Sequence, residues 1–584
     1  MAEMVLPGVY IEERPEALIV AGPITVGNIG IVGTARRGPL GEVKILSSLG
    51  DAMEIFGTSD DFKNPETPGN ELTLVRALEL AYANGASTVY AVRISKAAAA
   101  AKATFHVMGA QTTDPATNVV TVHLAALLEA RTHGTWGNDI GINVSNADEV
   151  SLIVDEKYIG STSKLKRQHI KEDPRNRIVI LKNSTGQTKI FNTVYDGTPK
   201  TGEVTITPSS GALTFANHEG PESTDTLYAT YVVEKENSKK VTLRYEGITE
   251  TYTVPDGKQL VDLVNDEDSG SSLVTGSSEK NPDTGEYILV LPTTDGYPND
   301  TTFVKFGKLT GDLPGDNGAV AGANEYDLGL QQLLNEECHI IIAAGQDVVT
   351  IGNKLKSHVE SASTDKIKHD RIAVVGSQKN ATFKEISDGG KNMDSDRVIM
   401  VGPGIIATDS ASGKNVTLPG AYASAAIAGM LSSRSPHVSL TNKTVSVAGL
   451  EIKLNPGQLE QLIKSKVLAL ESRQGPRIVK AITTSQNTAW QQITTRRITD
   501  YAKYGVRSAC DPYIGLLNND RVRRALKGSI NGFLAAMVDD EMLIGYQLDV
   551  TATREEEIRG IAKVTMTLQP TFSIDYIKVV MYLG

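Results

Sequence analysis

The first residues whose pattern could indicate a ligand-binding site are glycines at a three-residue spacing. Gly27, Gly30 and Gly33 recur along an apolar stretch, and glycine-rich loops before a helix can cradle a phosphate. The sequence lacks both the helix placement of a dinucleotide fingerprint and the GxxxxGK[ST] pattern of a phosphate loop. We therefore expect these glycines to be turn and packing positions.

A second glycine pair, Gly402 and Gly404, follows an apolar segment at a place where a ligand loop could lie. Pro403 between them lacks the amide donor that phosphate binding would use. The nine histidines show neither an HExxH pattern nor a zinc-binding spacing with cysteine, and no GxSxG elbow occurs. A Ser–His–Asp constellation can be built from distant residues, so it is neither supported nor forbidden. We expect no catalytic residue, cofactor or metal.

Length and composition indicate a large folded protein. At 584 residues, with 40% apolar and 22% charged residues, the chain predicts about three or four domains. A net charge of −11 argues against direct binding of nucleic acid. The two cysteines, Cys338 and Cys510, make no disulfide framework. The N-terminus lacks a signal-peptide pattern, and the apolar runs are shorter than the ~20 residues that cross a bilayer, so we expect no membrane insertion.

The elements that would position any site alternate between helix and strand in two separated parts of the chain. A helix followed by a strand is expected over 71–95, and apolar strands alternate with amphipathic helices from residue 326 to 403. Such alternation is typical of a largely parallel sheet covered on both faces. We predict four parts: an arm, 1–25; an α/β domain, 26–96 plus 325–437; an inserted β-rich outer region, 97–324; and a C-terminal domain, 438–584.

The last stretch, residues 561–584, shows a change of pattern. Val564, Met566 and Leu568 alternate with polar residues, as in a half-buried strand. After Pro570 both faces become apolar, and no further residues follow Gly584 to cover them. We predict that this tail, and the apolar N-terminal arm, join sheets of neighbouring copies by β-augmentation. The residues of these two arms are Val5, Leu6, Val9, Tyr10, Ile11, Ile574, Tyr576, Ile577, Val579, Met581 and Leu583.

A basic helix is predicted between Asn518 and Leu543. Val522, Leu526, Ile530, Phe533 and Met537 fall on one side at helical spacing. The remaining side carries Arg521, Arg523, Arg524 and Lys527. Either this side contacts an acidic partner or it is a solvated helix face.

Several motifs, in their order along the chain, resemble the contractile tail sheath proteins of tailed phages and related injection particles. They are PGVYIEERP (7–15), IGIVGTARRGP followed by DAMEIFG (51–57), LTNK (440–443), RRITDYAKYGVR (496–507) and LQPTFSIDYIKVVM near the end. The resemblance covers both ends and the α/β part, whereas region 97–324 is the part that such proteins vary.

The resemblance implies a subunit that polymerises as stacked hexameric rings around an inner tail tube. Terminal arms would be exchanged between subunits, and contraction would drive the tube through the target cell envelope. It also implies baseplate and tail terminator partners, assembly in the host cytoplasm and a place in the virion tail. The α/β domain would be subtilisin-like in fold. The protease motif GTSxA is not found where it would fall, since residues 419–424 read PGAYAS, so protease activity is not implied.

Two alternatives stay open from the sequence. One is an α/β hydrolase or nucleotide-binding enzyme with a β-rich insertion, which an ordered ligand beside residues 402–405 would favour. The other is a non-contractile tube or shell protein, which would form one helical lattice instead of two of different diameter.

Overall fold

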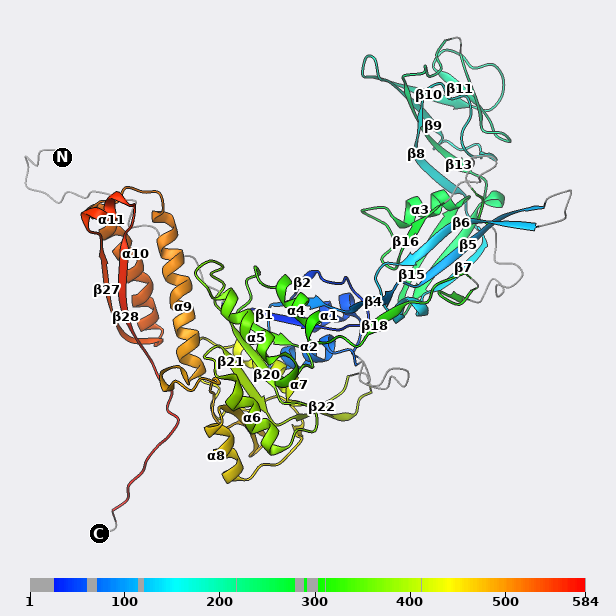
Figure 1. Ribbon diagram of the computed structural model, residues 1–584. Helices are drawn as coiled ribbons and strands as arrows, with labels where there is room; N and C mark the ends of the chain where they lie inside the picture. Colours follow the sequence, from blue (N-terminus) through cyan, green and yellow to red (C-terminus); the bar gives the residue numbers. More distant parts are fainter. Residues whose placement is uncertain are drawn as a thin grey trace, which may run out of the picture. The chain divides into compact units, whose positions relative to one another are not determined.

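The computed structural model describes residues 26–59, 71–113, 120–216, 218–278, 288–290, 303–309, 311–410 and 412–582 (Figure 1). The chain divides into two compact units. The first takes the residues up to 96 and those from 319 onward, and the second takes residues 97–318.

An eight-stranded sheet forms the centre of the first unit. Its six inner strands are parallel and its two edge strands are antiparallel to their neighbours. The inner strands have buried, unbroken apolar runs, as expected of a sheet covered on both faces. In spatial order the strands are β2 (Val43–Leu46), β3 (Val89–Arg93), β1 (Ile29–Gly33), β19 (Ile340–Ala343), β20 (Ile372–Gly376), β21 (Val398–Gly402), β25 (Val467–Ser472) and β26 (Pro476–Ile478).

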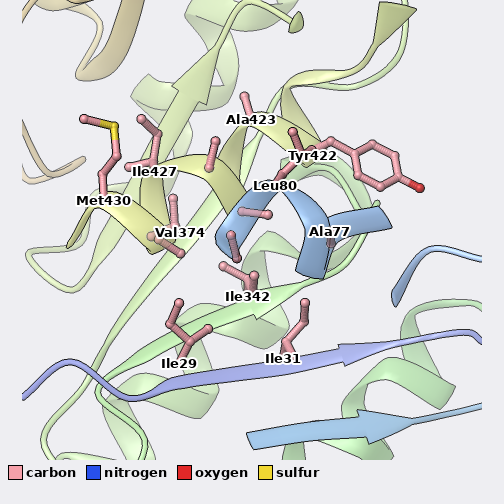
Figure 2. Packing of buried hydrophobic residues seen from close by; sticks show 14 of the residues in the cluster. Ile29, Ile31, Ala77, Leu80, Ile342, Val374, Tyr422, Ala423, Ile427 and Met430 are labelled. Atoms are coloured by element: carbon pink, nitrogen blue, oxygen red, sulfur yellow. The ribbon is translucent and has the colours of Figure 1, made fainter. Parts of the chain in front are cut away.

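Helices cover the two faces of this sheet. One face packs against α1 (Leu49–Phe56), α2 (Leu74–Ala83) and α7 (Gly420–Ser432). The other packs against α4 (Ala323–Gln332), α5 (Val348–Ala362), α6 (Phe383–Met393) and α8 (Pro456–Lys464). The core of the first face brings Ile29, Ile342 and Val374 of the sheet under Leu80 and Ile427 of the helices (Figure 2). Small residues let α7 approach closely, because a Cβ at Gly429 would overlap the backbone of Ala81.

A small sheet lies beside α7. It has the order β23 (Asn415–Leu418), β22 (Ile405–Thr408) and β24 (Gly449–Leu450). β24, α8, β25 and β26 all follow residue 437, where the sequence suggested the end of the α/β domain. β25 nevertheless pairs in parallel with β21, Val401 opposite Leu468, so the main sheet continues to Ile478. The division into four parts itself stays a prediction.

The second unit is rich in β-structure. Its six-stranded sheet has the order β12 (Ala212–Phe215), β11 (Glu203–Thr207), β10 (Gln187–Val194), β9 (Arg177–Lys182), β13 (Thr226–Val233) and β8 (Ser151–Ile159). A four-stranded sheet has the order β15 (Ile248–Val254), β14 (Lys239–Tyr245), β7 (Gly141–Asn146) and β17 (Val304–Lys305). A three-stranded sheet has the order β16 (Val274–Ser277), β6 (Val120–Ala130) and β5 (Thr104–Thr113). A two-stranded sheet pairs β18 (Asp316–Ala319) with β4 (Lys96–Ala101).

One helix of this unit, α3 (Gly257–Val264), is capped by a residue that also binds a buried arginine. Asp256 accepts a hydrogen bond from the amide of Gln259 and a second pair from Arg167 at 2.6 and 3.1 Å. Arg167 also contacts Glu156 on β8 at 2.6 Å. The buried guanidinium therefore links the six-stranded sheet to the start of α3.

The C-terminal part of the first unit is a helical hairpin and a β-hairpin. It contains α9 (Ile493–Cys510), α10 (Asp520–Asp539), β27 (Leu543–Thr551), α11 (Arg554–Ile558) and β28 (Lys563–Pro570). The chain is thus a mixed α/β multidomain protein with many sheets, as the sequence predicted. Among the described residues no helix is both long and apolar enough to span a bilayer.

Candidate assembly site

The helical hairpin of the C-terminal part is closed by a glycine–aromatic contact. A Cβ at Gly505 on α9 would overlap the ring of Phe533 on α10. The Phe533 ring also lies against Tyr501, with 5.7 Å between ring centroids. One face of the β27–β28 hairpin packs on the same core through Leu548 and Val564. The hairpin and the two helices therefore form one packed body.

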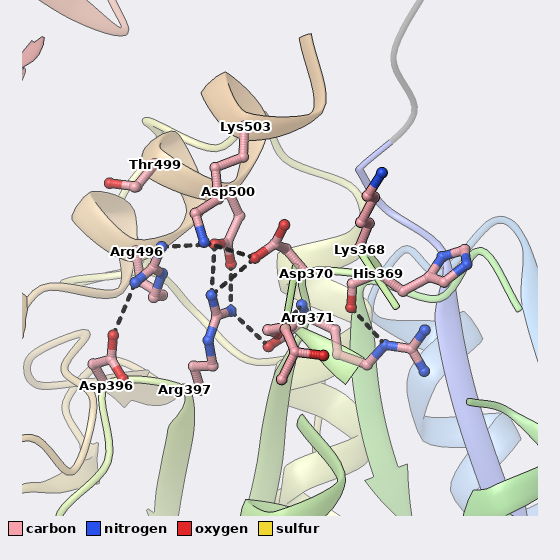
Figure 3. Close-up of polar contacts among 12 residues, drawn as sticks. Lys368, His369, Asp370, Arg371, Asp396, Arg397, Arg496, Thr499, Asp500 and Lys503 are labelled. Carbon is pink, nitrogen blue, oxygen red and sulfur yellow. Dashed lines mark hydrogen bonds and ion pairs between the residues drawn. The ribbon is translucent and has the colours of Figure 1, made fainter. Parts of the chain in front are cut away.

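Buried charges join α9 to the main sheet (Figure 3). Arg397, at the start of β21, donates two hydrogen bonds to the Asp500 carboxylate, at 2.8 and 3.0 Å. Asp500 also accepts a bond from Arg496 one helical turn earlier, at 2.7 Å, and Arg496 reaches Asp396 at 2.9 Å. The side chains of Arg397, Arg496 and Asp500 are at most 10% exposed. Removing one member of such a buried network leaves an unpaired charge, which is strongly destabilising.

A second carboxylate, Asp370, extends the network along α9. It accepts bonds from Arg397 at 3.1 Å, from Lys503 at 3.0 Å and from Arg507 at 2.5 Å. Burial by itself raises the pKa of Asp370, but the hydrogen bonds from Arg507 and Lys503 outweigh it and hold that pKa below its usual value. Asp370 therefore binds these cations as a carboxylate at neutral pH.

The tail that follows β28 is fixed at one point near its root. The Asp575 carboxylate, 9% exposed, lies 3.3 Å from the Lys480 ammonium. It also accepts hydrogen bonds from Thr441 at 3.3 Å and from Gln492 at 3.2 Å. The Lys480 ammonium lies 4.9 Å from the Tyr576 ring centroid. We call Asp575 and these partners the tail anchor.

Beyond the tail anchor the described tail is exposed and apolar. Ile577 is 80% exposed, Val579 73% and Met581 84%, and none of residues 571–582 lies in a regular strand. The tail leaves the hairpin as an extended trace (Figure 1). Apart from Lys578, the side chains from Ile577 to Tyr582 are all large and apolar.

The β27–β28 hairpin is a two-stranded sheet with two outer edges. The two strands pair with each other from Leu543–Pro570 to Thr551–Lys563, and within the described residues no further strand joins them. Strand edges of this kind carry unpaired backbone donors and acceptors.

Comparison with protein families identifies the part of the chain that carries these features. The model of the phage tail sheath protein central domain matches residues 319–484, and the model of the phage tail sheath C-terminal domain matches residues 485–584. Residues 319–584 belong to the phage tail sheath family. The resemblance seen in the sequence is thereby confirmed. The buried charge network lies across the limit between the two sheath domains, and the tail anchor joins Lys480 of the central domain to Asp575 of the C-terminal one.

Solved structures of sheath proteins share the fold. A sheath tail protein from Desulfitobacterium hafniense aligns over 97% of this chain and 100% of its own, with 14% identity and a TM-score of 0.54. A sheath tail protein from Listeria innocua aligns over 96% of this chain and 95% of its own, with 13% identity and a TM-score of 0.57. The contracted helical sheath of the anti-feeding prophage matches less closely, at 16% identity, over 46% of this chain and 77% of that one, with a TM-score of 0.38. Comparison with curated protein sequences found no match.

The sheath family is structural, not enzymatic. The glycines that suggested chemistry are close-packed here. A Cβ at Gly30 would overlap Ile341, and one at Gly33 would overlap Ala344. Gly404 lies against Glu451 and the Leu418 carbonyl. Among the described residues, no group of three or more His, Cys, Asp or Glu side chains is placed to hold a metal ion.

The basic residues predicted on the sheath C-terminal domain lie in different surroundings. Arg521 and Arg524 are exposed on α10. Arg523 is only 9% exposed, contacts Asp520 and reaches Glu557 of α11 at 3.0 Å. Lys527 is half-exposed and lies 3.2 Å from Asp549 of β27. Arg523 and Lys527 thus lie against acidic residues of α11 and β27, and Arg521 and Arg524 are the exposed cations of this face.

The predicted arm residues fall on both sides of the described range. Ile574, Tyr576, Ile577, Val579 and Met581 lie in the exposed tail. The other six, Val5, Leu6, Val9, Tyr10, Ile11 and Leu583, lie outside the described residues.

Sequence reasoning missed the tail anchor and the charge network. The four-residue spacing of Arg496 and Asp500 was a visible signal for a helical ion pair. Their partner Arg397 is 103 residues from Asp500, and Asp575 contacts Thr441 and Lys480 across similar separations. No local pattern links residues that far apart.

Proposed function

We propose that this protein is the subunit of a contractile tail sheath. The subunits polymerise as stacked hexameric rings around an inner tube, and contraction drives that tube through the target cell envelope. The observation that carries the proposal is the exposed apolar tail, anchored at Asp575, in a chain whose residues 319–584 are sheath domains. The sheath is assembled in the host cytoplasm and forms part of the virion tail, with the tube, baseplate and tail terminator as further partners.

The tail is the joint between subunits. Residues from Ile577 onward add a strand to a free edge of the β27–β28 hairpin of a neighbouring copy, and the N-terminal arm makes a similar exchange. Each backbone hydrogen bond gained contributes about 0.5–1.5 kcal/mol. Each buried Ile, Val or Met side chain contributes about 1.5–3 kcal/mol, against an ordering cost of about 1–2 kcal/mol per residue. The apolar side chains therefore decide whether the joint is stable.

Contraction requires parts that move as rigid bodies between such joints. The network of Arg397, Asp500 and Asp370 holds the helical hairpin on the main sheet, so the two sheath domains move together. Weaker polar contacts between subunits then rearrange while the exchanged strands stay paired.

The outward face of α10 meets the tube or a neighbouring subunit through Arg521 and Arg524. Exposed ion pairs contribute only about 0–1 kcal/mol each and weaken with salt, which suits a contact that must be released. We expect Arg521→Glu with Arg524→Glu to weaken binding to the tube protein, whereas Lys527→Gln should change it less because Lys527 is only half-exposed. If both variants bind the tube protein as tightly as the wild type does, this contact is contradicted.

The α/β domain is proposed to be subtilisin-like in fold. Six parallel strands between two helical layers are compatible with that architecture. The sheath function does not depend on it.

Electron microscopy of purified protein tests the joint. The variant Ile577→Ser/Val579→Ser/Met581→Ser should fold normally, because these side chains are exposed, and should fail to polymerise. The control Leu328→Ser/Val349→Ser changes apolar residues that are 61% and 75% exposed on α4 and α5 and should polymerise like the wild type. Normal polymers from the tail variant would refute strand exchange. Tubes of a single diameter under all conditions would favour a non-contractile shell.

A further inference from the structure

A cavity of about 190 Å³ lies at the carboxyl ends of the central strands in the first unit. Thr34, residues 345–347 and Gln378 line it just after β1, β19 and β20. From β1 the chain runs through α2 to β3 on one side, whereas β19, β20 and β21 follow one another on the other side. The strand order therefore reverses between β1 and β19. Ligands of open α/β sheets bind in the crevice outside the carboxyl ends of the strands at such a reversal.

Three buried hydroxyl groups of the cavity wall direct their protons into the protein. Thr34, Thr73 and Tyr326 are each at most 8% exposed. The Thr34 hydroxyl donates to the Glu71 carbonyl oxygen at 3.2 Å, and the Tyr326 hydroxyl donates to the Ala344 carbonyl oxygen at 2.9 Å. The Thr73 hydroxyl lies 2.9 Å from that of Tyr326 and therefore donates to it. Burial raises the pKa of Tyr326 to about 12, so these protons stay in place at neutral pH.

The two threonine oxygens can still accept hydrogen bonds from a ligand. Thr34 and Thr73 accept each other's backbone amides, at 3.1 and 3.2 Å. A hydroxyl oxygen has two lone pairs, so each threonine oxygen keeps one that is not used by these bonds. The hydroxyl groups of this part of the wall therefore offer acceptors and no donors.

The charged groups of the wall favour a cation. Asp347 caps α5 with Oδ1 alone, which accepts two amides of the first turn, both at 2.9 Å. Its Oδ2 forms no hydrogen bond or ion pair with the residues that the structure describes. Glu71 and Lys379 lie 3.7 Å apart and offset each other. With two acids and one base among the lining residues, the wall has a net charge of −1.

The helix starts around the cavity do not reverse this preference. Glu325 and Glu385 lie in the first turns of α4 and α6, and Lys384 beside Glu385 is paired with Asp388 at 2.5 Å. The first turn of α7 also reaches the wall, but the amides of its second and third residues donate to carbonyl oxygens at 3.0 and 2.9 Å. A carboxylate or phosphate would therefore find few free donors here.

We propose that this cavity binds a small primary alkylamine as its ammonium ion. The ammonium group donates hydrogen bonds to Oδ2 of Asp347 and to the Thr34 and Thr73 oxygens, and the alkyl chain lies along Ala321 and Leu418 of the wall. A cavity of ~150 Å³ can hold benzene, so this one has room for a ligand of about six non-hydrogen atoms. All lining residues come from one unit of one chain, and the ligand is a free small molecule. The inference goes beyond the sheath function and does not depend on it.

Saturation-transfer-difference NMR on the unassembled full-length chain tests the site. The probe is n-butylammonium chloride. Tetramethylammonium chloride is its matched control, because that cation is an isomer with the same charge but has no N–H donor. Both are titrated at equal ionic strength.

Three variants locate the binding site. Asp347→Asn removes the charge and keeps the helix cap, since asparagine also caps helices. Val320→Trp enlarges a lining residue that is 47% exposed, so it should fold and obstruct the cavity. Asp365→Asn is the control, because Asp365 is fully exposed and follows the other end of α5.

The wild type should bind n-butylammonium saturably, with a dissociation constant on the order of 1–10 mM. Tetramethylammonium should bind at least about tenfold more weakly, because it cannot donate to the acceptors of the wall. Asp347→Asn should weaken n-butylammonium binding about tenfold, since a neutral oxygen replaces a charged acceptor. Val320→Trp should weaken it as well, and Asp365→Asn should bind like the wild type.

Three outcomes would overturn the proposal. The first is that the wild type binds neither cation saturably, and the second is that it binds both equally well. The third is that Asp347→Asn binds n-butylammonium as tightly as the wild type, which would place the cation elsewhere on the chain. The first two comparisons use the wild type alone and do not require any variant to fold.

Discussion

Asp500 is predicted to be the most sensitive single residue of the joint between the two sheath domains. Its two carboxylate oxygens accept three hydrogen bonds, from Arg397 and Arg496, and its side chain is 10% exposed. Asp500→Asn keeps the shape of the side chain but removes its negative charge. The guanidinium groups of Arg397 and Arg496 then have one carboxylate partner fewer. Breaking a buried ion pair by removing one partner costs about 3–5 kcal/mol. That is a large part of the ~5–15 kcal/mol that stabilises a typical domain.

Urea unfolding followed by far-ultraviolet circular dichroism measures this cost on the unassembled chain. Asp365→Asn is the matched control, because Asp365 is fully exposed and lies 4.0 Å from Arg507 in the same neighbourhood. Its effect should be below about 0.5 kcal/mol. Limited proteolysis should cut first near residues 485–492 in Asp500→Asn, since α9 is released from the sheet. If Asp500→Asn unfolds within 0.5 kcal/mol of the control, the network does not hold the two domains together.

Three further predictions concern single positions of the same unit. Gly505→Val should lower the free energy of unfolding in urea by about 1–3 kcal/mol, because its side chain overlaps the Phe533 ring. Gly528→Ala on α10 should raise it by about 0.5–1 kcal/mol, because a Cβ there meets no atom within 4 Å. Equal effects of the two substitutions would contradict the packing. Asp575→Ala should speed proteolytic cleavage within residues 571–582 with little change in global stability. Cleavage at the wild-type rate would mean that the tail anchor does not fix the tail. The pKa of Asp370 is lowered in the folded state, so its contribution to stability is present above its unfolded pKa of about 4 and is lost as pH falls through the folded value. The drop in unfolding free energy between neutral and acidic pH should therefore be smaller in Asp370→Asn than in the wild type. Parallel plots of stability against pH for the two proteins would refute the assignment.

The sequence predicted the α/β layers because their signals are local. The apolar runs that became β19, β20 and β21 lie between amphipathic helices, and each helix has a visible start such as Asp347 or Thr382. β25 and β26 were not assigned to this sheet, because the short run from Val467 carries no mark of its distant neighbour β21.

The candidate site was predictable only in part. The apolar composition of the tail predicted that its side chains need a covering partner. It did not predict where the tail is held, because nothing in the sequence distinguishes Asp575 from an acidic residue on the surface. The helical periodicity of α10 put Arg523 on the polar side. It could not show that Glu557 of α11 lies against that side and buries Arg523. Partners contributed by other elements decide which cations face outward.

If the tails are exchanged as proposed, the tail anchor also limits how far apart two joined subunits can move. Ile577 follows Asp575 by two residues, which span at most about 7 Å of extended chain. A strand that pairs with Ile577 lies about 5 Å farther away, so a neighbour's strand has to stay within about 12 Å of the donor's Asp575 as long as the anchor holds. The C-terminal domains of linked subunits would then turn about a nearly fixed pivot, and the larger displacements of a shortening sheath would occur farther from it.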